Sequence, residues 1–305
     1  MLDHVLATDH GQSDVCGLKE EPLQYGEGGQ SMGILTLPIA SPRHGRELPV
    51  FVFLNAGLLH RVGPRRLHVL LARELSQLGF ASLRIDLDGT GDSIKRSGLT
   101  HEQSVAADFA EIMSVLETRL GRVRIVLAGL CSGADDAIKL TQSQPRVVGM
   151  ILLDPVCLRD AGFATRAMLR TAINLAAKLF YPMVPLRRRV QKFLKRDWAR
   201  EAFKEQDETY DLLSLRQSPT REQTREALNS IRQRDGRVLS VFTNYALPYY
   251  NQKGQMGRVS NVEGYQEFCT ELFWPDVQHT YPLEVHRLRL MKAINSWAGD
   301  YLVGH

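Results

Sequence analysis

The sequence predicts an α/β fold with a mostly parallel, doubly wound sheet. Short runs rich in valine, isoleucine and leucine recur along the 305 residues, and most are apolar throughout instead of alternating with polar residues. Such runs are typical of strands buried on both faces of a parallel sheet. Between them lie stretches with leucine at helical spacing, as in Leu67–Leu78. The alternation of the two patterns indicates a doubly wound sheet.

The expected elements follow one another regularly up to Asp154. The predicted strands are Met32–Ile39, Val50–Leu54, Ala81–Ile85, Val123–Ala128, Val147–Leu153, Val238–Thr243 and Thr270–Trp274. The predicted helices are Leu67–Leu78, Ser104–Leu120, Ala134–Gln142 and Pro282–Leu302. Residues 1–19 show neither pattern, and we expect them to form a loosely ordered lead-in.

A helical insertion interrupts the alternation late in the sheet. No strand pattern is evident from about Leu158 to Asp235, where an apolar helical stretch precedes a basic one. We predict a cap over residues 158–235, inserted into a core formed by residues 1–157 and 236–305. The apolar stretch would line an acyl-chain pocket or would simply be core packing, and the sequence leaves both open.

The composition excludes several classes of protein. The chain is 44% hydrophobic and 24% charged, which is ordinary for one large soluble domain. Its first residues carry no basic start, and no apolar run approaches the ~20 residues that a membrane helix needs. Four widely spaced cysteines form no zinc pattern: Cys16, Cys131, Cys157 and Cys269. We expect a reduced, cytoplasmic protein without a metal or cofactor.

A strand–turn–helix motif carries the strongest chemical signal. The strand Val123–Ala128 runs into Gly129-Leu130-Cys131-Ser132-Gly133 and then into a helical stretch. This is the Gly-x-nucleophile-x-Gly arrangement, in which a tight, strained turn requires glycine on both sides. The following helix points its positive end at the nucleophile, which favours a thiolate. Cys131 is the expected nucleophile, because a frame centred on Ser132 loses both glycines. The alternative is a small buried residue at a glycine-rich turn.

Three segments, in this order, resemble the α/β-hydrolase superfamily. They are Asn55–Arg66, Leu83–Ser93 and the turn around Cys131. More narrowly, the chain is similar to hydrolases associated with bacterial exosortase systems and to related acyl hydrolases. The resemblance extends to His279 and covers most of the chain outside the cap. It implies an α/β-hydrolase fold with a helical cap inserted late in the sheet.

The resemblance also indicates a base and an oxyanion hole. His279 follows the last predicted strand, where the superfamily places its histidine, and a neutral imidazole can accept the thiol proton and later protonate the leaving group. The alternative is a histidine in a surface loop. An oxyanion is usually held by two backbone N–H groups. One would belong to Ser132, and the resemblance assigns the other to Leu58.

The acid is where this sequence departs from the superfamily pattern. The segment after the strand Val238–Thr243 contains no carboxylate, although the superfamily usually has one there. Some lipases take the acid from the end of the preceding strand, and Asp154 stands at that position. Asn244 or Asp276 could orient the imidazole instead. A Cys–His pair depends less on a third residue than a Ser–His pair, because thiols ionise more easily.

Two charged regions allow further interpretations. Asp86, Asp88 and Asp92 form a superfamily landmark that we expect to be structural, with a metal site as the alternative. The run Arg187–Lys204 has eight basic residues against two acidic ones. It would bind the phosphates of coenzyme A, an acyl carrier protein or anionic lipid headgroups, or it is a solvated helix face. We expect no nucleic acid partner, since no recognised module accompanies the charge.

The sequence leaves three hypotheses for the function open. The first is an esterase or thioesterase that forms an acyl-enzyme at Cys131 and releases it to water. The second is an acyltransferase that passes the acyl group to an alcohol, amine or thiol. Polyester synthases of the superfamily also use an elbow cysteine, although they usually have a further glycine where this chain has Ala134. The third is a non-catalytic binding protein, which the unusual position of the acid favours.

Overall fold

The computed structural model describes residues 18–26, 29–38, 48–179 and 217–303. Within these ranges eight strands form one sheet in the order β1-β2-β4-β3-β5-β6-β7-β8. The neighbours from β4 to β8 are parallel, whereas β1 pairs antiparallel with β2 and β2 antiparallel with β4. This mostly parallel sheet, covered by helices on both faces, confirms the predicted fold class.

Where the sequence predicted the bounds of a strand or helix, the structure agrees with them to within about three residues, whereas two short helices over residues 255–260 and 265–268 were not predicted. The strands are β1 (Leu18–Tyr25), β2 (Ser31–Pro38), β3 (Val50–Phe53), β4 (Ser82–Ile85), β5 (Ile125–Leu130), β6 (Val147–Leu153), β7 (Arg237–Thr243) and β8 (Cys269–Trp274). The helices are α1 (Leu67–Gln77), α2 (His101–Leu120), α3 (Ser132–Ser143), α4 (Phe163–Leu179), α7 (Arg221–Gln233), α8 (Gln255–Ser260), α9 (Tyr265–Phe268) and α10 (Glu284–Val303), with 3₁₀ turns at η2 (Pro64–Arg66) and η4 (Asn244–Ala246).

The strand β1 is missing from the sequence prediction. Its residues are mostly exposed or half-buried, and only Leu23 and Tyr25 are buried. The predicted strands are runs that are apolar throughout, a pattern that marks strands buried on both faces. β1 instead lies at the edge of the sheet and contains Pro22, a residue that edge strands tolerate. Residues 18 and 19, assigned to the lead-in, therefore belong to the sheet.

Each face of the sheet has its own apolar core. On one face α1 and α10 pack against the strands through Leu71 and Ile294, and on the other α2, α3 and α7 pack through Phe109, Ile138 and Leu228. The central strands β3, β5 and β6 are buried along their whole length. This layered arrangement brings the carboxyl ends of the parallel strands to one edge of the sheet.

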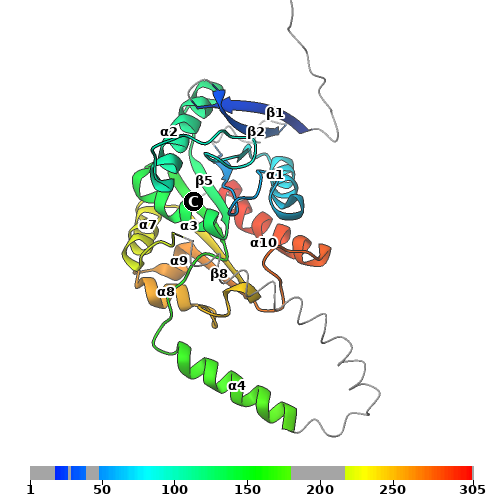
Figure 1. The fold of residues 1–305 in the computed structure, drawn as a ribbon, viewed down its shortest axis with the longest axis vertical. Coiled ribbons are helices and arrows are strands. Elements are labelled where there is room, and N and C mark those ends of the chain that lie inside the picture. Colours follow the sequence, from blue (N-terminus) through cyan, green and yellow to red (C-terminus); the bar gives the residue numbers. More distant parts are fainter. Residues whose placement is uncertain (1–17, 27–28, 39–47, 180–216, 304–305) are drawn as a thin grey trace, which may run out of the picture.

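The predicted insertion contains two helices of different character. Figure 1 shows α4 extending away from the sheet, and its residues Met168, Leu169 and Ile173 are exposed. In contrast, α7 covers the sheet and buries Ala227, Leu228 and Ile231 against it. A helix of the core therefore lies within the range 158–235 assigned to the cap, and the limits of the cap stay a prediction. Among the described residues no helix is long and apolar enough to cross a membrane.

Candidate active site

Cys131 lies in the turn between β5 and α3. Its backbone has φ 59° and ψ −121°, a strained combination for a residue with a side chain. The turn is held at both ends, since the Cys131 N–H donates to the Leu153 carbonyl at 2.9 Å and its carbonyl accepts from the Ala134 N–H at 3.0 Å. A Cβ atom added to Gly129 would collide with the Gly133 backbone. Both glycines are therefore required by close approach of the backbone.

The loop after β3 packs directly against this turn. A Cβ atom on Gly133 would collide with the Asn55 carbonyl, and the Gly57 N–H donates to the Ser132 hydroxyl oxygen at 2.8 Å. Ser132 is the first residue of α3, so its own N–H has no acceptor within the helix. The Leu58 N–H also makes no hydrogen bond to another described residue. The two amides predicted to hold an oxyanion thus lie on adjoining segments with their donors unused.

His279 and Asp154 come together at the same edge of the sheet. Asp154 follows β6 and is fully buried, whereas His279 lies in the loop after β8 and is half-buried. His279 Nδ1 lies 2.7 Å from Asp154 Oδ2. Because Nδ1 is hydrogen-bonded to the Asp154 carboxylate, the other ring nitrogen of His279, Nε2, is available to exchange a proton with the Cys131 thiol.

Thr243 fixes the orientation of the Asp154 carboxylate. The Thr243 N–H donates to Asp154 Oδ1 and the Thr243 hydroxyl donates to Oδ2, both at 2.6 Å. Asp154 itself has φ 49°, a left-handed conformation that aspartate tolerates better than most residues. Thr243 ends β7, the strand after which the superfamily usually carries its acid. Its role is not predictable from the sequence, because a threonine at a strand end carries no chemical signal of its own.

The other two candidates for orienting the imidazole have different partners. Asp276 accepts from the Arg289 guanidinium at 3.0 Å on the exposed surface. Asn244 starts the η4 turn, where its N–H donates to the Val277 carbonyl and its carbonyl accepts from the Leu247 N–H. Of the three residues that the sequence left open, Asp154 is the one hydrogen-bonded to His279.

The surroundings of His279 favour its protonated form. Burial alone would lower the pKa of the imidazole, but hydrogen bonds to Asp154 and Cys131, together with their charges, raise it to about 9. The Tyr245 ring stacks on the imidazole with 3.9 Å between the ring centroids. The Tyr245 hydroxyl lies 3.9 Å from Cys131 Sγ, within the range of a weak hydrogen bond to sulfur. Tyr245 is a further residue of the site that no sequence pattern indicated.

The aspartates of the second motif have structural partners. Asp86 is fully buried and accepts from the Asn55 side chain at 3.1 Å and from the Arg61 N–H at 2.6 Å. The Arg61 guanidinium contacts both Asp86 and Asp92, while Asp88 accepts from the Arg96 N–H at 2.7 Å. His60 also lies near Asp86 and Asp92, and the three could hold a metal by their spacing alone. The Arg61 guanidinium already places a cation between these carboxylates, which favours the structural interpretation.

The basic run Arg187–Lys204 lies outside the described residues, so its interpretation stays a prediction. The remaining described thiols, Cys157 and Cys269, are free and buried away from solvent. Burial raises the pKa of each of these thiols far above its ordinary value. Of the described cysteines, Cys131 is the one that is partly exposed.

The parallel sheet, the strained turn at Cys131 and the His279–Asp154 pair define the class of protein: a member of the α/β-hydrolase superfamily. A family model described as serine aminopeptidase, S33, matches residues 57–287, so the chain belongs to this hydrolase family. A search of curated proteins finds no match.

Solved structures agree with the fold at low sequence identity. A dienelactone hydrolase from Anabaena variabilis is 12% identical with a TM-score of 0.52, and the match covers 92% of this chain and 97% of that one. A thermophilic esterase from Thermogutta terrifontis is 19% identical with a TM-score of 0.51, covering 93% and 99%. An esterase from Pyrococcus furiosus is 13% identical with a TM-score of 0.52, covering 92% and 90%. At these identities the likeness concerns the fold alone.

Proposed function

We propose that the protein is an acyl hydrolase that acts on esters or thioesters through a covalent intermediate at Cys131. One observation carries the proposal: the 2.7 Å contact between His279 Nδ1 and Asp154 Oδ2, beside a cysteine in a strained strand–turn–helix. A third group that orients the imidazole is the general requirement for an activated nucleophile. The esterases and the dienelactone hydrolase of similar fold lend support by analogy.

The first half of the reaction transfers the acyl group to sulfur. The Cys131 thiolate attacks the acyl carbonyl and forms the C–S bond, and the Leu58 and Ser132 amides bind the oxyanion. The bond to the leaving group then breaks, and His279 gives its Nε2 proton to the departing alkoxide or thiolate. A protonated imidazole beside the thiolate, as the raised pKa of His279 implies, is the starting state that this step needs.

The second half returns the enzyme to its resting form. Water attacks the acyl-Cys131 carbonyl while the neutral His279 accepts its proton. The oxyanion collapses, the C–S bond breaks, and the carboxylic acid leaves. Cys131 departs as the thiolate beside the imidazolium, so all atoms and protons are accounted for. Asp154 keeps the imidazole in the orientation that both halves require.

Intact-protein mass spectrometry tests the proposal directly. The protein is mixed with p-nitrophenyl esters and with N-acetylcysteamine thioesters of several chain lengths, and wild type is compared with Cys131→Ala. We expect an added mass equal to the acyl group, located on Cys131 and missing from the variant. Cys157→Ala is the matched control, because it also removes a described thiol but one that is buried. It should keep the adduct.

Two outcomes would contradict the proposal. An adduct that persists in Cys131→Ala would assign the nucleophile elsewhere. No adduct and no turnover across the panel would favour the non-catalytic hypothesis, which drew its support from the unusual position of the acid. The hydrogen bond between His279 and Asp154 weakens that support.

Acyl transfer to a second substrate is the alternative, favoured by the cysteine itself. A thioester acyl-enzyme exchanges readily with thiols and amines, so the same intermediate serves both reactions. The lifetime of the adduct decides between them: hydrolysis predicts decay in water, and transfer predicts decay only when an acceptor is added. The association with exosortase systems and a cytoplasmic location also remain proposals, the latter because a reducing compartment keeps the thiol active.

A further inference from the structure

A hollow of about 720 Å³ lies beside the start of α4, between α8 and the first residue of α7. Its size falls within the range of small-molecule sites in proteins. Four arginines line it: Arg159, Arg166, Arg221 and Arg258. We call this feature the arginine hollow. Among the described residues that line it, Asp160 is the only carboxylate.

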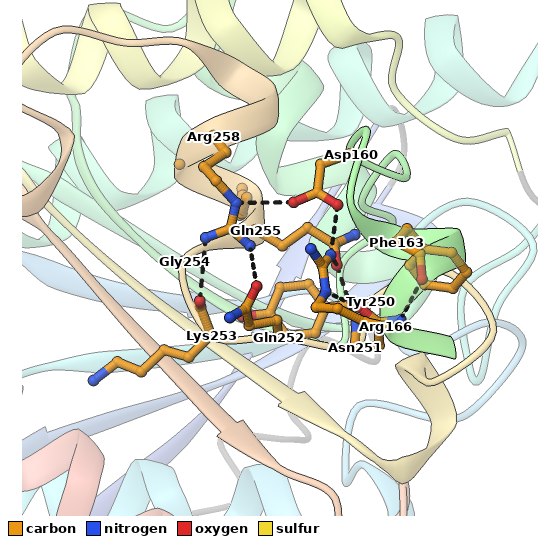
Figure 2. Close-up of polar contacts among 12 residues, drawn as sticks. Asp160, Phe163, Arg166, Tyr250, Asn251, Gln252, Lys253, Gly254, Gln255 and Arg258 are labelled. Atoms are coloured by element: carbon orange, nitrogen blue, oxygen red, sulfur yellow. Dashed lines mark hydrogen bonds and ion pairs between the residues drawn. The ribbon is translucent and has the colours of Figure 1, made fainter. Parts of the chain in front are cut away.

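Asp160 leaves much of this positive charge unbalanced. Figure 2 shows it between two of the arginines, with Arg166 Nη2 at 2.5 Å and Arg258 Nε at 2.8 Å. Although burial opposes it, these hydrogen bonds hold the pKa of Asp160 below its ordinary value. One ionised carboxylate thus contacts two of the four guanidinium groups that line the hollow, and all four remain protonated at every physiological pH.

Neutral partners hold the arginines in place. The Arg159 guanidinium donates to the Pro248 carbonyl at 2.8 Å, and Arg221 Nε donates to the Val259 carbonyl at 2.7 Å. Arg258 also donates to the Gln252 side chain at 3.1 Å (Figure 2). Carbonyl oxygens fix the direction of a guanidinium without cancelling its charge. At least two of the five N–H donors of each arginine thus remain for a ligand with anionic oxygens.

Hydrogen bonds of two amide side chains, Gln255 and Asn251, also support the segments that carry the arginines. Gln255 is fully buried, and its amide nitrogen donates to the Leu158 and Tyr249 carbonyls at 3.1 and 2.6 Å. It thereby ties the segment after β6 to the segment after β7. Asn251 reinforces the tie by accepting from Arg166 and donating to the Phe163 carbonyl (Figure 2). Such bonds fix the arginines before any ligand arrives, which reduces the entropy cost of binding.

The arginine hollow lies at the same edge of the sheet as the candidate active site. Arg159 follows Asp154 by five residues, so their Cα atoms are at most about 18 Å apart. Gln252, which also lines the hollow, lies in the segment that follows Thr243 and η4 along the chain. A substrate with a long arm can therefore place its anionic groups in the arginine hollow while its reacting bond lies at Cys131. Thioesters of pantetheine have this form, because a flexible arm separates the thioester from one or more phosphates.

We propose that the arginine hollow binds the phosphates at the end of the pantetheine arm of a thioester substrate, carried by coenzyme A or by an acyl carrier protein. This inference rests on the proposed thioester chemistry of Cys131. The arginine hollow would select for the carrier, while the acyl group would bind in the candidate active site at Cys131. Arginine suits this role, since its planar group binds phosphate oxygens in pairs.

Two substrates with the same acyl group test the proposal: the coenzyme A thioester and the N-acetylcysteamine thioester, which lacks phosphate. The measured quantity is kcat/KM for the coenzyme A thioester divided by kcat/KM for the N-acetylcysteamine thioester. In Arg221→Gln we expect this ratio to fall about tenfold, through a higher KM for the coenzyme A substrate. Arg221 is chosen because its substitution leaves the pairing of Asp160 with Arg166 and Arg258 in place. The matched control is Arg225→Gln, which removes the same charge from the same helix outside the hollow. Its ratio should stay within about twofold of wild type.

Calorimetry separates a failure of this inference from a failure of the proposed function. Cys131→Ala is titrated with coenzyme A and with pantetheine, so no turnover is needed. We expect coenzyme A to bind more tightly than pantetheine, and Arg221→Gln in this background to weaken the binding of coenzyme A about tenfold. An Arg221 dependence seen with an acylated carrier protein alone would assign the phosphate to that carrier. If Arg221→Gln and Arg225→Gln have the same ratio of kcat/KM, relative to the N-acetylcysteamine thioester, with coenzyme A and with the acyl carrier protein, the proposal is overturned.

Discussion

Two buried aspartates, Asp86 and Asp154, occupy equivalent places in the fold and have different partners. Asp86 follows β4 and Asp154 follows β6, and neither side chain is exposed. Asp86 is paired with Arg61, while Asp154 is hydrogen-bonded to His279. A guanidinium never releases its proton in a protein, whereas an imidazole exchanges protons near neutral pH. The partner, rather than the carboxylate, distinguishes a structural anchor from a group that can serve catalysis.

The hydrogen bonds around each aspartate match this difference. Asp86 collects donors from the loop after β3, namely Asn55 and the Arg61 backbone, and thereby fixes the loop that carries Leu58. Asp154 collects its donors from Thr243 and presents the remaining face to the imidazole. The Asp86 carboxylate stabilises a loop, whereas the Asp154 carboxylate orients an imidazole that can transfer a proton.

The largest expected effect comes from Asp154→Asn. The asparagine keeps the shape but loses the charge, and it can hold the imidazole in the wrong tautomer. We expect kcat on an activated ester to fall about 10²- to 10³-fold, with the acyl adduct forming more slowly at the same residue. Steady-state and single-turnover kinetics measure the change. Asp276→Asn is the control, since Asp276 pairs with Arg289 at the surface. A wild-type rate in Asp154→Asn would refute the assigned role.

Asp86→Asn tests the structural role of the other buried aspartate. The substitution leaves the Arg61 guanidinium, which is 11% exposed, without its buried partner. Breaking a buried ion pair costs about 3–5 kcal/mol of folding free energy, and we expect a loss near the lower end because Asp92 still contacts the Arg61 guanidinium. Urea unfolding of the variant and of wild type gives the difference. If Asp86 acts as an anchor, the variant is less stable but keeps the wild-type pH profile of kcat. A shifted pH profile would point to a catalytic part for Asp86.

The pH dependence of activity is expected to show the smallest effect. It tests most directly whether Asp154, unlike Asp86, acts through the protonation of His279. With a pKa of about 9, His279 is protonated below that pH and loses its proton above it. Acylation needs that proton for the leaving group, so activity should fall as the pH rises through about 9. In Asp154→Asn the hydrogen bond and charge that raise the pKa are lost, and the fall should move to lower pH. An unmoved alkaline limb would show that a different group titrates.

The parts of the candidate site that depend on local structure were predictable from the sequence. The turn at Cys131 was predictable because Gly129 and Gly133 are required within one short segment. His279 was predictable from its position after the last strand. The acid stayed open among Asp154, Asn244 and Asp276, because the choice depends on which side chain reaches His279 across neighbouring strands. Thr243 and Tyr245 were missed for the same reason, since their contacts join residues far apart in the chain.

The sequence by itself determined the fold class, the order of the central strands along the chain, the strained turn at Cys131 and the candidate histidine. The fold class follows from the alternation of buried runs with helical stretches, and the turn follows from two glycines within one short segment. The histidine follows from the order of motifs in the superfamily that the sequence resembles. The tertiary structure alone decided that β1 completes the sheet edge, that Asp154 meets His279, and that four arginines line one hollow. These features arise where separate segments pack side by side, and the distance between two such segments is set by the whole sheet.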